Sequence, residues 1–113
     1  MAISFDSNSI VVQRATGQTR KKQIYLTELD TVRLSCFYEK AFATGASLTV
    51  TWATVPDGNT NVTLASQTDT LLATEIYATA ADGTDGARTV VKCTATDGTE
   101  AFTTSYTLYC TQT

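Results

Sequence analysis

The order of apolar and polar residues follows a two-residue period along most of the chain. In residues 31–38, Val32, Leu34 and Cys36 alternate with polar residues, and the alternation continues in residues 48–52. Successive side chains of a β-strand point to opposite faces, so this pattern predicts strands with one buried face and one exposed face. A helical period of apolar residues is nearly absent, which favours an all-β fold.

Turn-forming residues divide the chain into short segments. The pattern predicts six to eight strands, drawn from residues 9–14, 23–26, 31–38, 48–52, 62–64, 71–78, 88–96 and 101–110. The dipeptide Asp97-Gly98 between the last two segments is a strong signal for a β-hairpin. Short strands without intervening helices predict an antiparallel β-sandwich of about seven strands.

The length of the chain is typical of one domain. Its 113 residues, 42% hydrophobic and 17% charged, are enough to form a single core. We predict an amino-terminal strand and basic arm over residues 1–22, with an extended conformation as one alternative. The sandwich itself is expected over residues 23–113.

Basic residues are concentrated near the amino terminus. The net charge is −3, so we expect neither a nucleic-acid nor an anionic-membrane partner. Six of the eight basic residues lie in the first 40 positions, and acidic residues dominate afterwards, which predicts two halves of opposite sign. We predict that Arg14, Arg20, Lys21 and Lys22 form a partner-binding segment, with a solvated loop as the alternative.

Three residues link the chain to a known fold family. Cys36, Trp52 and Cys93 occur in this order on inward positions of predicted strands, and the arrangement resembles an immunoglobulin-like domain. The resemblance implies that Trp52 packs against the two cysteines in the core. Val91 stands where antibody domains have a tyrosine, and the segment 90–98 resembles the last hairpin of bacterial and phage immunoglobulin-like modules.

Three cysteines cannot all form disulfides within one chain, so at least one thiol stays free. Cys110 lies at one of the alternate positions of its predicted strand that point toward the core. One interpretation is three buried thiols that act as small apolar side chains. The alternative is a Cys36–Cys93 disulfide that forms after release from the cell. A zinc site is not expected, because the sequence has no histidine and no Cys-x-x-Cys spacing.

Signals for catalysis are weak. The absence of histidine removes the commonest general base, and no phosphate-binding, dinucleotide-binding or nucleophile-elbow motif is present. The loop from Asp82 to Asp85 lacks the ligand spacing of a calcium loop. We therefore predict that the chain is not an enzyme and binds no cofactor or metal. A polysaccharide-cleaving enzyme with two carboxylates is the remaining enzymatic alternative.

Functional expectations rest on the resemblance and on the amino terminus, which shows no secretory signal. A phage virion protein is made in the host cytoplasm and released by lysis. The resemblance therefore implies a structural protein of the virion, namely a capsid decoration or cement protein that stabilises the assembled shell. Its expected partner is the phage major capsid protein or another virion protein, with the chain homo-oligomeric or bound to a lattice.

The alternative function is an immunoglobulin-like adhesion or carbohydrate-binding module, for example a tail or fibre accessory protein. Such a module would expose aromatic side chains, and Phe42 and Phe37 are the candidates. The two-residue period places large apolar residues in the interior, so a core position for either ring is the competing interpretation.

Overall fold

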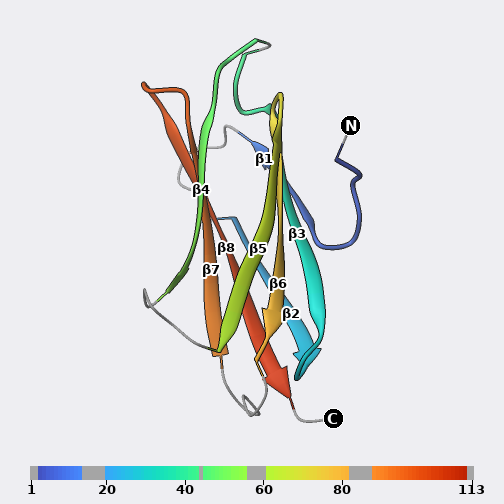
Figure 1. Ribbon diagram of the computed structural model, residues 1–113. Coiled ribbons are helices and arrows are strands. Elements are labelled where there is room, and N and C mark those ends of the chain that lie inside the picture. The colour runs from blue at the N-terminus through green and yellow to red at the C-terminus, as the bar shows by residue number, and fades with distance from the viewer. Residues whose placement is uncertain (1–2, 14–19, 44, 56–60, 82–87, 112–113) are drawn as a thin grey trace.

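The computed structural model describes residues 3–13, 20–43, 45–55, 61–81 and 88–111. Within them the chain forms eight β-strands in two layers (Figure 1). These strands are β1 (Ser9–Gln13), β2 (Arg20–Thr27), β3 (Thr31–Lys40), β4 (Thr49–Val55), β5 (Val62–Thr70), β6 (Ala73–Ala80), β7 (Arg88–Thr96) and β8 (Ala101–Thr111). No helix of the described residues has the length and apolar character needed to cross a bilayer.

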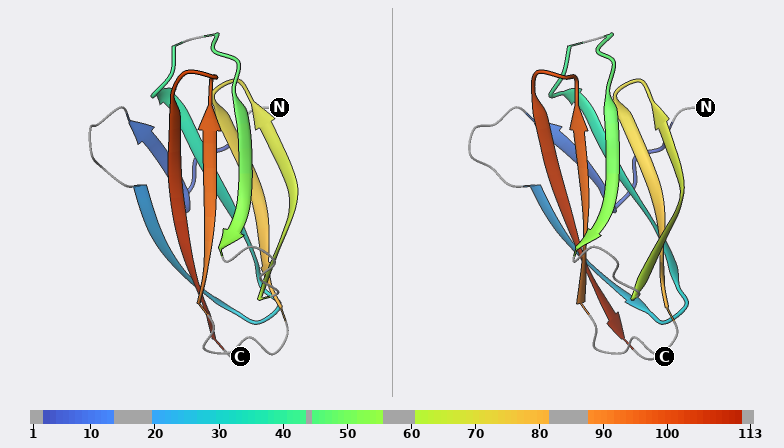
Figure 2. Two further views of the ribbon diagram at one scale, coloured as in Figure 1. Left: turned by 90° about the vertical axis from the view of Figure 1, so that its left-hand side faces the viewer. Right: turned by 60° about the vertical axis from the view of Figure 1, so that its left-hand side comes forward.

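Each layer is a four-stranded sheet. Sheet A has the order β1-β3-β6-β5, and sheet B has the order β2-β8-β7-β4. Two views turned about the vertical axis show the sheets face to face (Figure 2). The first two strands pair in parallel, β1 with β3 and β2 with β8, whereas the other pairs are antiparallel. The predicted immunoglobulin-like sandwich is confirmed, with two parallel pairs that the sequence pattern did not indicate.

The core lies between the inward faces of the two sheets. The alternation of β3 buries Leu34, Cys36 and Tyr38 completely, and β8 does the same with Tyr106 and Leu108. Outward positions on β8 are mostly threonine and serine, whose branched or short polar side chains suit an exposed pleated surface. The binary pattern of the sequence therefore determines which face of each strand meets the other sheet.

The predicted hairpin around Asp97-Gly98 is confirmed. It connects β7 to β8, and Gly98 has a φ of 97°, a left-handed conformation that glycine adopts without strain. Asp97 Oδ1 accepts hydrogen bonds from the backbone N–H groups of Thr99 and Glu100 at 2.9 and 2.8 Å. The aspartate is thus a turn residue, as its sequence context predicts.

The second predicted strand starts earlier than expected. The sequence pattern assigned residues 20–22 to an arm or loop, but they begin β2, which pairs with β8 from Arg20 to Thr27. Strand β2 therefore extends across the boundary proposed between residues 22 and 23. The turn segments 56–59 and 82–86, including the loop considered for calcium, lie outside the described residues.

Candidate binding surface

The outer face of sheet B presents a regular grid of polar and basic side chains. Residues paired across β2, β8 and β7 lie side by side and point to the same face. Three such rows make up a surface that we call the basic face: Lys21, Ser105 and Lys92; Gln23, Thr107 and Val90; and Tyr25, Tyr109 and Arg88.

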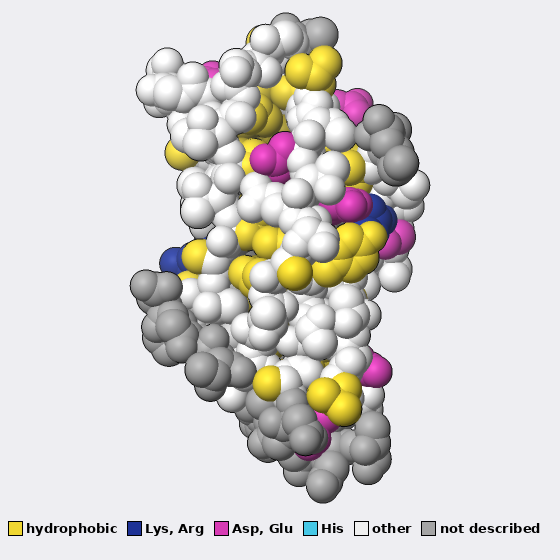
Figure 3. All heavy atoms as spheres, in the orientation of Figure 1, with side chains coloured by type: hydrophobic (Ala, Val, Ile, Leu, Met, Phe, Trp, Pro, Cys, Tyr) yellow, Lys and Arg dark blue, Asp and Glu magenta, His cyan; other side chains and the backbone are white. Residues whose placement is uncertain are grey.

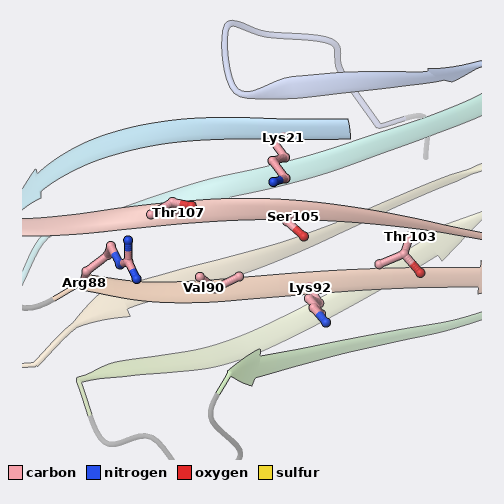
Figure 4. A pocket seen from close by; sticks show the side chains of 7 residues that line it. All are labelled: Lys21, Arg88, Val90, Lys92, Thr103, Ser105 and Thr107. Atoms are coloured by element: carbon pink, nitrogen blue, oxygen red, sulfur yellow. The ribbon is translucent and has the colours of Figure 1, made fainter. Parts of the chain in front are cut away.

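An open depression of ≈ 560 Å³ lies on this face. Lys21, Arg88 and Lys92 line it together with hydroxyl-bearing residues of β8 and with Val90. Figure 4 shows Lys21, Ser105 and Lys92 following one another across three neighbouring strands. Neighbouring strands lie about 4.8 Å apart, so Lys21 and Lys92 are separated by roughly 10 Å. The face thus offers two ammonium groups, one guanidinium group and several hydroxyl groups to a single ligand.

The charges of the basic face are not neutralised by any residue that the structure describes. None of its nine residues is acidic, and none of its three cations forms an ion pair with a described residue. The separation of Lys21 and Lys92 across two strand spacings is close to the Debye length at physiological ionic strength, about 8 Å, so these two cations repel one another weakly. An anionic partner would remove this repulsion, which makes the face a candidate binding surface.

Two tyrosines form the aromatic end of the same face. The rings of Tyr25 and Tyr109 stack with centroids 4.9 Å apart and an interplanar angle of 17°. The Tyr25 side chain is nonetheless 71% exposed. Exposed aromatic rings combine a large apolar surface with a hydroxyl group, a combination typical of binding sites.

The four residues predicted to bind a partner have different outcomes. Arg14 lies outside the described residues, and so does the side chain of Arg20, whose backbone begins β2. Lys21 is exposed and belongs to the basic face. Lys22 is half-buried, and the alternation of the strand directs it to the opposite side of β2.

The sequence reasoning missed Arg88 and Lys92 as partners of Lys21. Both residues occupy outward positions of the predicted strand 88–96. Because side chains four residues apart on a strand point to the same side, their common face could have been deduced from the sequence. Their proximity to Lys21 depends on the pairing of β2 with β8, which joins segments about eighty residues apart. Cations from both halves of the sequence therefore meet on this face.

The three residues that carry the family resemblance do meet in the core. Trp52 is the register partner of Cys93, and its ring stacks on Tyr106 with a centroid distance of 6.1 Å. Its Nε1–H donates a hydrogen bond of 2.9 Å to Thr74 Oγ1 in the opposite sheet. Cys36 and Cys93 are both fully buried. All three residues thus belong to the buried core, with Trp52 beside Cys93 on the neighbouring strand.

All three cysteines are buried thiols in this structure. The Tyr38 hydroxyl lies 3.2 Å from Cys93 Sγ, and Thr104 Oγ1 lies 3.2 Å from Cys36 Sγ. Hydrogen bonding with Cys36, together with burial, raises the pKa of the Cys93 thiol. Burial also raises the pKa of Tyr38. The Cys93 thiol and the Tyr38 hydroxyl thus act as neutral structural polar groups, whereas the hydrogen bond with Cys93 lowers the pKa of the Cys36 thiol.

The outer face of sheet A has a different arrangement of charge. The Arg33 guanidinium contacts Asp6 Oδ2 at 2.7 Å and Glu75 Oε1 at 2.8 Å, and it donates to the carbonyl of Ser4. Hydrogen bonds to Asp6 and to Glu75 raise the pKa of Arg33. Partial burial is the largest single effect on the Asp6 carboxyl and acts to raise its pKa. The hydrogen bonds from Arg33, the Asn8 backbone and Ser9, together with the charge of Arg33, outweigh it and lower that pKa from 3.8. Arg33 therefore fixes the amino-terminal segment on sheet A.

The aromatic candidates for an alternative ligand site are not on the basic face. Phe42 is buried, with 4% of its surface exposed, and packs edge-on against Phe102 at 5.2 Å. Phe37 is half-buried and lies against Phe5, with ring centroids 5.6 Å apart. The core interpretation is thus confirmed for Phe42.

Comparisons with known proteins identify the fold. No family model matches the sequence, and neither does any curated protein. Among solved structures, the chain is similar to the titin M3 domain, with a TM-score of 0.52 and 11% identity over 85% of this chain and 94% of that one. It is also similar to part of an endo-fucoidan hydrolase of glycoside hydrolase family 107, with a TM-score of 0.54 and 13% identity. That match covers 83% of this chain and 13% of the hydrolase.

The hydrolase match corrects one prediction. Sequence analysis predicted that the chain is not an enzyme, and this is contradicted by a similar domain within the chain of a hydrolase. The absence of histidine and of catalytic motifs in one β-sandwich does not decide whether such a sandwich takes part in an enzyme, because function resides in sites and not in folds. At 13% identity the match shows the fold alone.

Proposed function

We propose that this chain is a phage capsid decoration protein that binds the assembled shell through its basic face. The observation that carries the proposal is the group of Lys21, Arg88 and Lys92 on one face, with no acidic residue among the nine that form it. The bacterial and phage modules that the 90–98 segment resembles supply the biological setting. An acidic area on the shell is the complementary surface.

The charge distribution of the whole protein favours one orientation on such a shell. The net charge is −3, so the basic face is attracted to an acidic surface while the rest of the molecule is repelled from it. Complementary potentials of this kind direct association and fix orientation more than they add affinity. The hydroxyl groups of Ser105 and Thr107 beside the cations would then donate hydrogen bonds to carboxylates.

Shell stabilisation follows from mass action. A ligand that binds the assembled shell but not its separated subunits shifts the equilibrium toward the assembled state. The sandwich needs no conformational change for this role, because its surface is built on paired strands within sheet B.

A carbohydrate-binding module is the second candidate, and the stacked Tyr25–Tyr109 pair favours it. Such a module would bind a sugar against the exposed Tyr25 ring, in the row that continues through Tyr109 to Arg88. The two candidates share Arg88 but differ in their use of Lys92 and Tyr25, so substitutions at these two positions can separate them.

The test is co-sedimentation of the purified chain with phage capsids at increasing salt. Lys92→Glu should weaken binding about tenfold, equivalent to about 1.4 kcal/mol. The matched control is Lys40→Glu, which makes the same charge change at an exposed position at the end of β3 in sheet A. Loss of capsid binding in both variants, or in neither, would contradict the proposed face. Loss of glycan binding in Tyr25→Ala would instead support the carbohydrate-binding module.

A further inference from the structure

The four edges of the two sheets differ in how they are protected against pairing with another chain. An open edge exposes backbone N–H and C=O groups, and proteins commonly protect it with charges, bulges or short strands. Strand β1 has five residues and an irregular register between Val11 and Gln13. Strand β2 begins with three basic residues. Strand β5 has a bulge between Ala65 and Thr68, where Ser66 has a φ of 60°.

Strand β4 has none of these features. Its seven residues, Thr49–Val55, include no charged residue and no proline, and they pair with β7 in an uninterrupted register. Figure 3, in which β4 and β5 lie toward the viewer, shows a surface made mostly of neutral polar groups. By the criteria that identify protected edges, β4 is the open edge among the strands that the structure describes.

The alternation of hydrogen bonds along β7 determines which backbone groups of β4 point away from the sheet. Asp97 N–H donates to Glu100 C=O at the hairpin. Counting back from Asp97, every second residue of β7 therefore directs its backbone N–H and C=O groups to β8, and the residues between them direct theirs to β4. Thr94 is one that faces β4, where its partner is Thr51. The N–H and C=O groups of Val50, Trp52 and Thr54 therefore point away from the sheet.

One side chain already uses this edge. Gln67 Nε2, on the neighbouring β5, donates a hydrogen bond of 3.2 Å to the carbonyl of Val50. This geometry agrees with the alternation deduced above. Within the described residues, the backbone groups of Trp52 and Thr54 on this edge have no hydrogen-bond partner.

We propose that β4 pairs with β4 of a second copy of this chain, antiparallel and about a two-fold axis at Trp52. The strand is self-complementary in this register. The N–H and C=O groups of Trp52 would bond reciprocally to those of the partner's Trp52, while Thr51 would lie opposite the partner's Ala53. Threonine and other β-branched residues pack well across paired strands. The strand is uncharged, so no like charges oppose one another at the axis, which favours a second copy over a charged segment of another protein.

Pairing of this kind would join the two B sheets into one continuous sheet. Both basic faces would then lie on the same side, so that one dimer presents two binding surfaces to a shell. Edge pairing alone buries less than the about 1,200 Å² of a stable interface, so the dimer is expected to be weak in solution. Two linked surfaces bind a lattice more tightly than one, without any new contact.

The test is sedimentation equilibrium of the purified chain without capsids, so that its outcome is independent of the proposed function. The wild-type chain should show a reversible monomer–dimer equilibrium. Thr51→Lys should weaken the dimer about tenfold or more, because the new lysines of the two copies would lie about 7–8 Å apart on one face. The matched control is Thr103→Lys, since Thr51 and Thr103 are both exposed and flank Thr94 in one row, but Thr103 lies on the interior strand β8. The control should dimerise as the wild type does.

A double variant tests the register. Adding Ala53→Glu to Thr51→Lys places opposite charges across the proposed axis and should restore the dimer. Tryptophan fluorescence confirms that each variant is folded. The proposal is overturned if the wild-type chain stays monomeric at its highest soluble concentration. It is also overturned if Thr51→Lys and Thr103→Lys affect the dimer equally, or if the double variant stays as weak as Thr51→Lys.

Discussion

The two outer faces of the sandwich use charged residues in different ways. On sheet A, Arg33 lies between Asp6 and Glu75 and is largely shielded, with 17% of its side chain exposed. On sheet B, Lys21, Arg88 and Lys92 form no ion pair with any described residue. Charge on sheet A therefore contributes to the stability of the chain, whereas charge on sheet B is available to a partner. Substitutions should separate these two roles.

The largest effect is expected where both sheets depend on one side chain. Trp52 extends from sheet B and donates to Thr74 of sheet A, so Trp52→Ala should lower the free energy of unfolding by about 3–5 kcal/mol. Chemical denaturation measures this change. Trp52→Phe, which keeps an aromatic ring but loses the N–H donor, should cost less. A loss below about 1 kcal/mol for the alanine variant would contradict the core position of the indole ring.

Removal of the cation on sheet A should have a smaller but clear effect. Arg33→Ala leaves Asp6 and Glu75 close together without their shared partner, and should destabilise the chain by about 1–2 kcal/mol. Thermal unfolding at neutral pH gives the measurement. An unchanged stability would show that the amino-terminal segment does not depend on this cluster.

Acid should weaken the same cluster. The pKa of Asp6 is lowered in the folded chain from 3.8, so its contribution to stability is present above that value and is lost as the pH falls through the folded pKa. The wild-type chain should therefore lose more stability below pH 3.8 than Asp6→Asn does. Thermal unfolding of both proteins across this range measures the difference. Parallel pH profiles would contradict a role for the Asp6 carboxylate.

The smallest effect on stability is expected on the basic face. Arg88→Ala is the same substitution as Arg33→Ala, but it removes an exposed side chain without an ion partner among the described residues. It should change the free energy of unfolding by less than about 0.5 kcal/mol. Its effect should appear in capsid binding instead. An equal loss of stability in the two arginine variants would contradict the proposed difference between the roles of charge on sheet A and on sheet B.

Period-two alternation was sufficient to predict the all-β sandwich and the core position of Trp52, and the Asp97-Gly98 dipeptide predicted the last hairpin. These features depend on local pattern, because parity alone assigns each side chain to a face. The parallel pairing of β2 with β8 was not predicted, since register between distant segments depends on the packing of the whole sandwich. For the same reason the sequence indicated Lys21 but did not connect it with Lys92. The sequence pattern likewise did not indicate that Arg33 on β3 has two carboxylate partners.

The parallel arrangement of β2 and β8 has a mechanical consequence. Their eight register pairs run from Arg20 beside Thr104 to Thr27 beside Thr111. A pulling force applied to Arg20 and Thr111 would act along the two strands in opposite directions. The hydrogen bonds between them would then share the load simultaneously instead of opening one after another. A tether attached at these two points would thus pull against the whole length of the ladder before the sandwich could open.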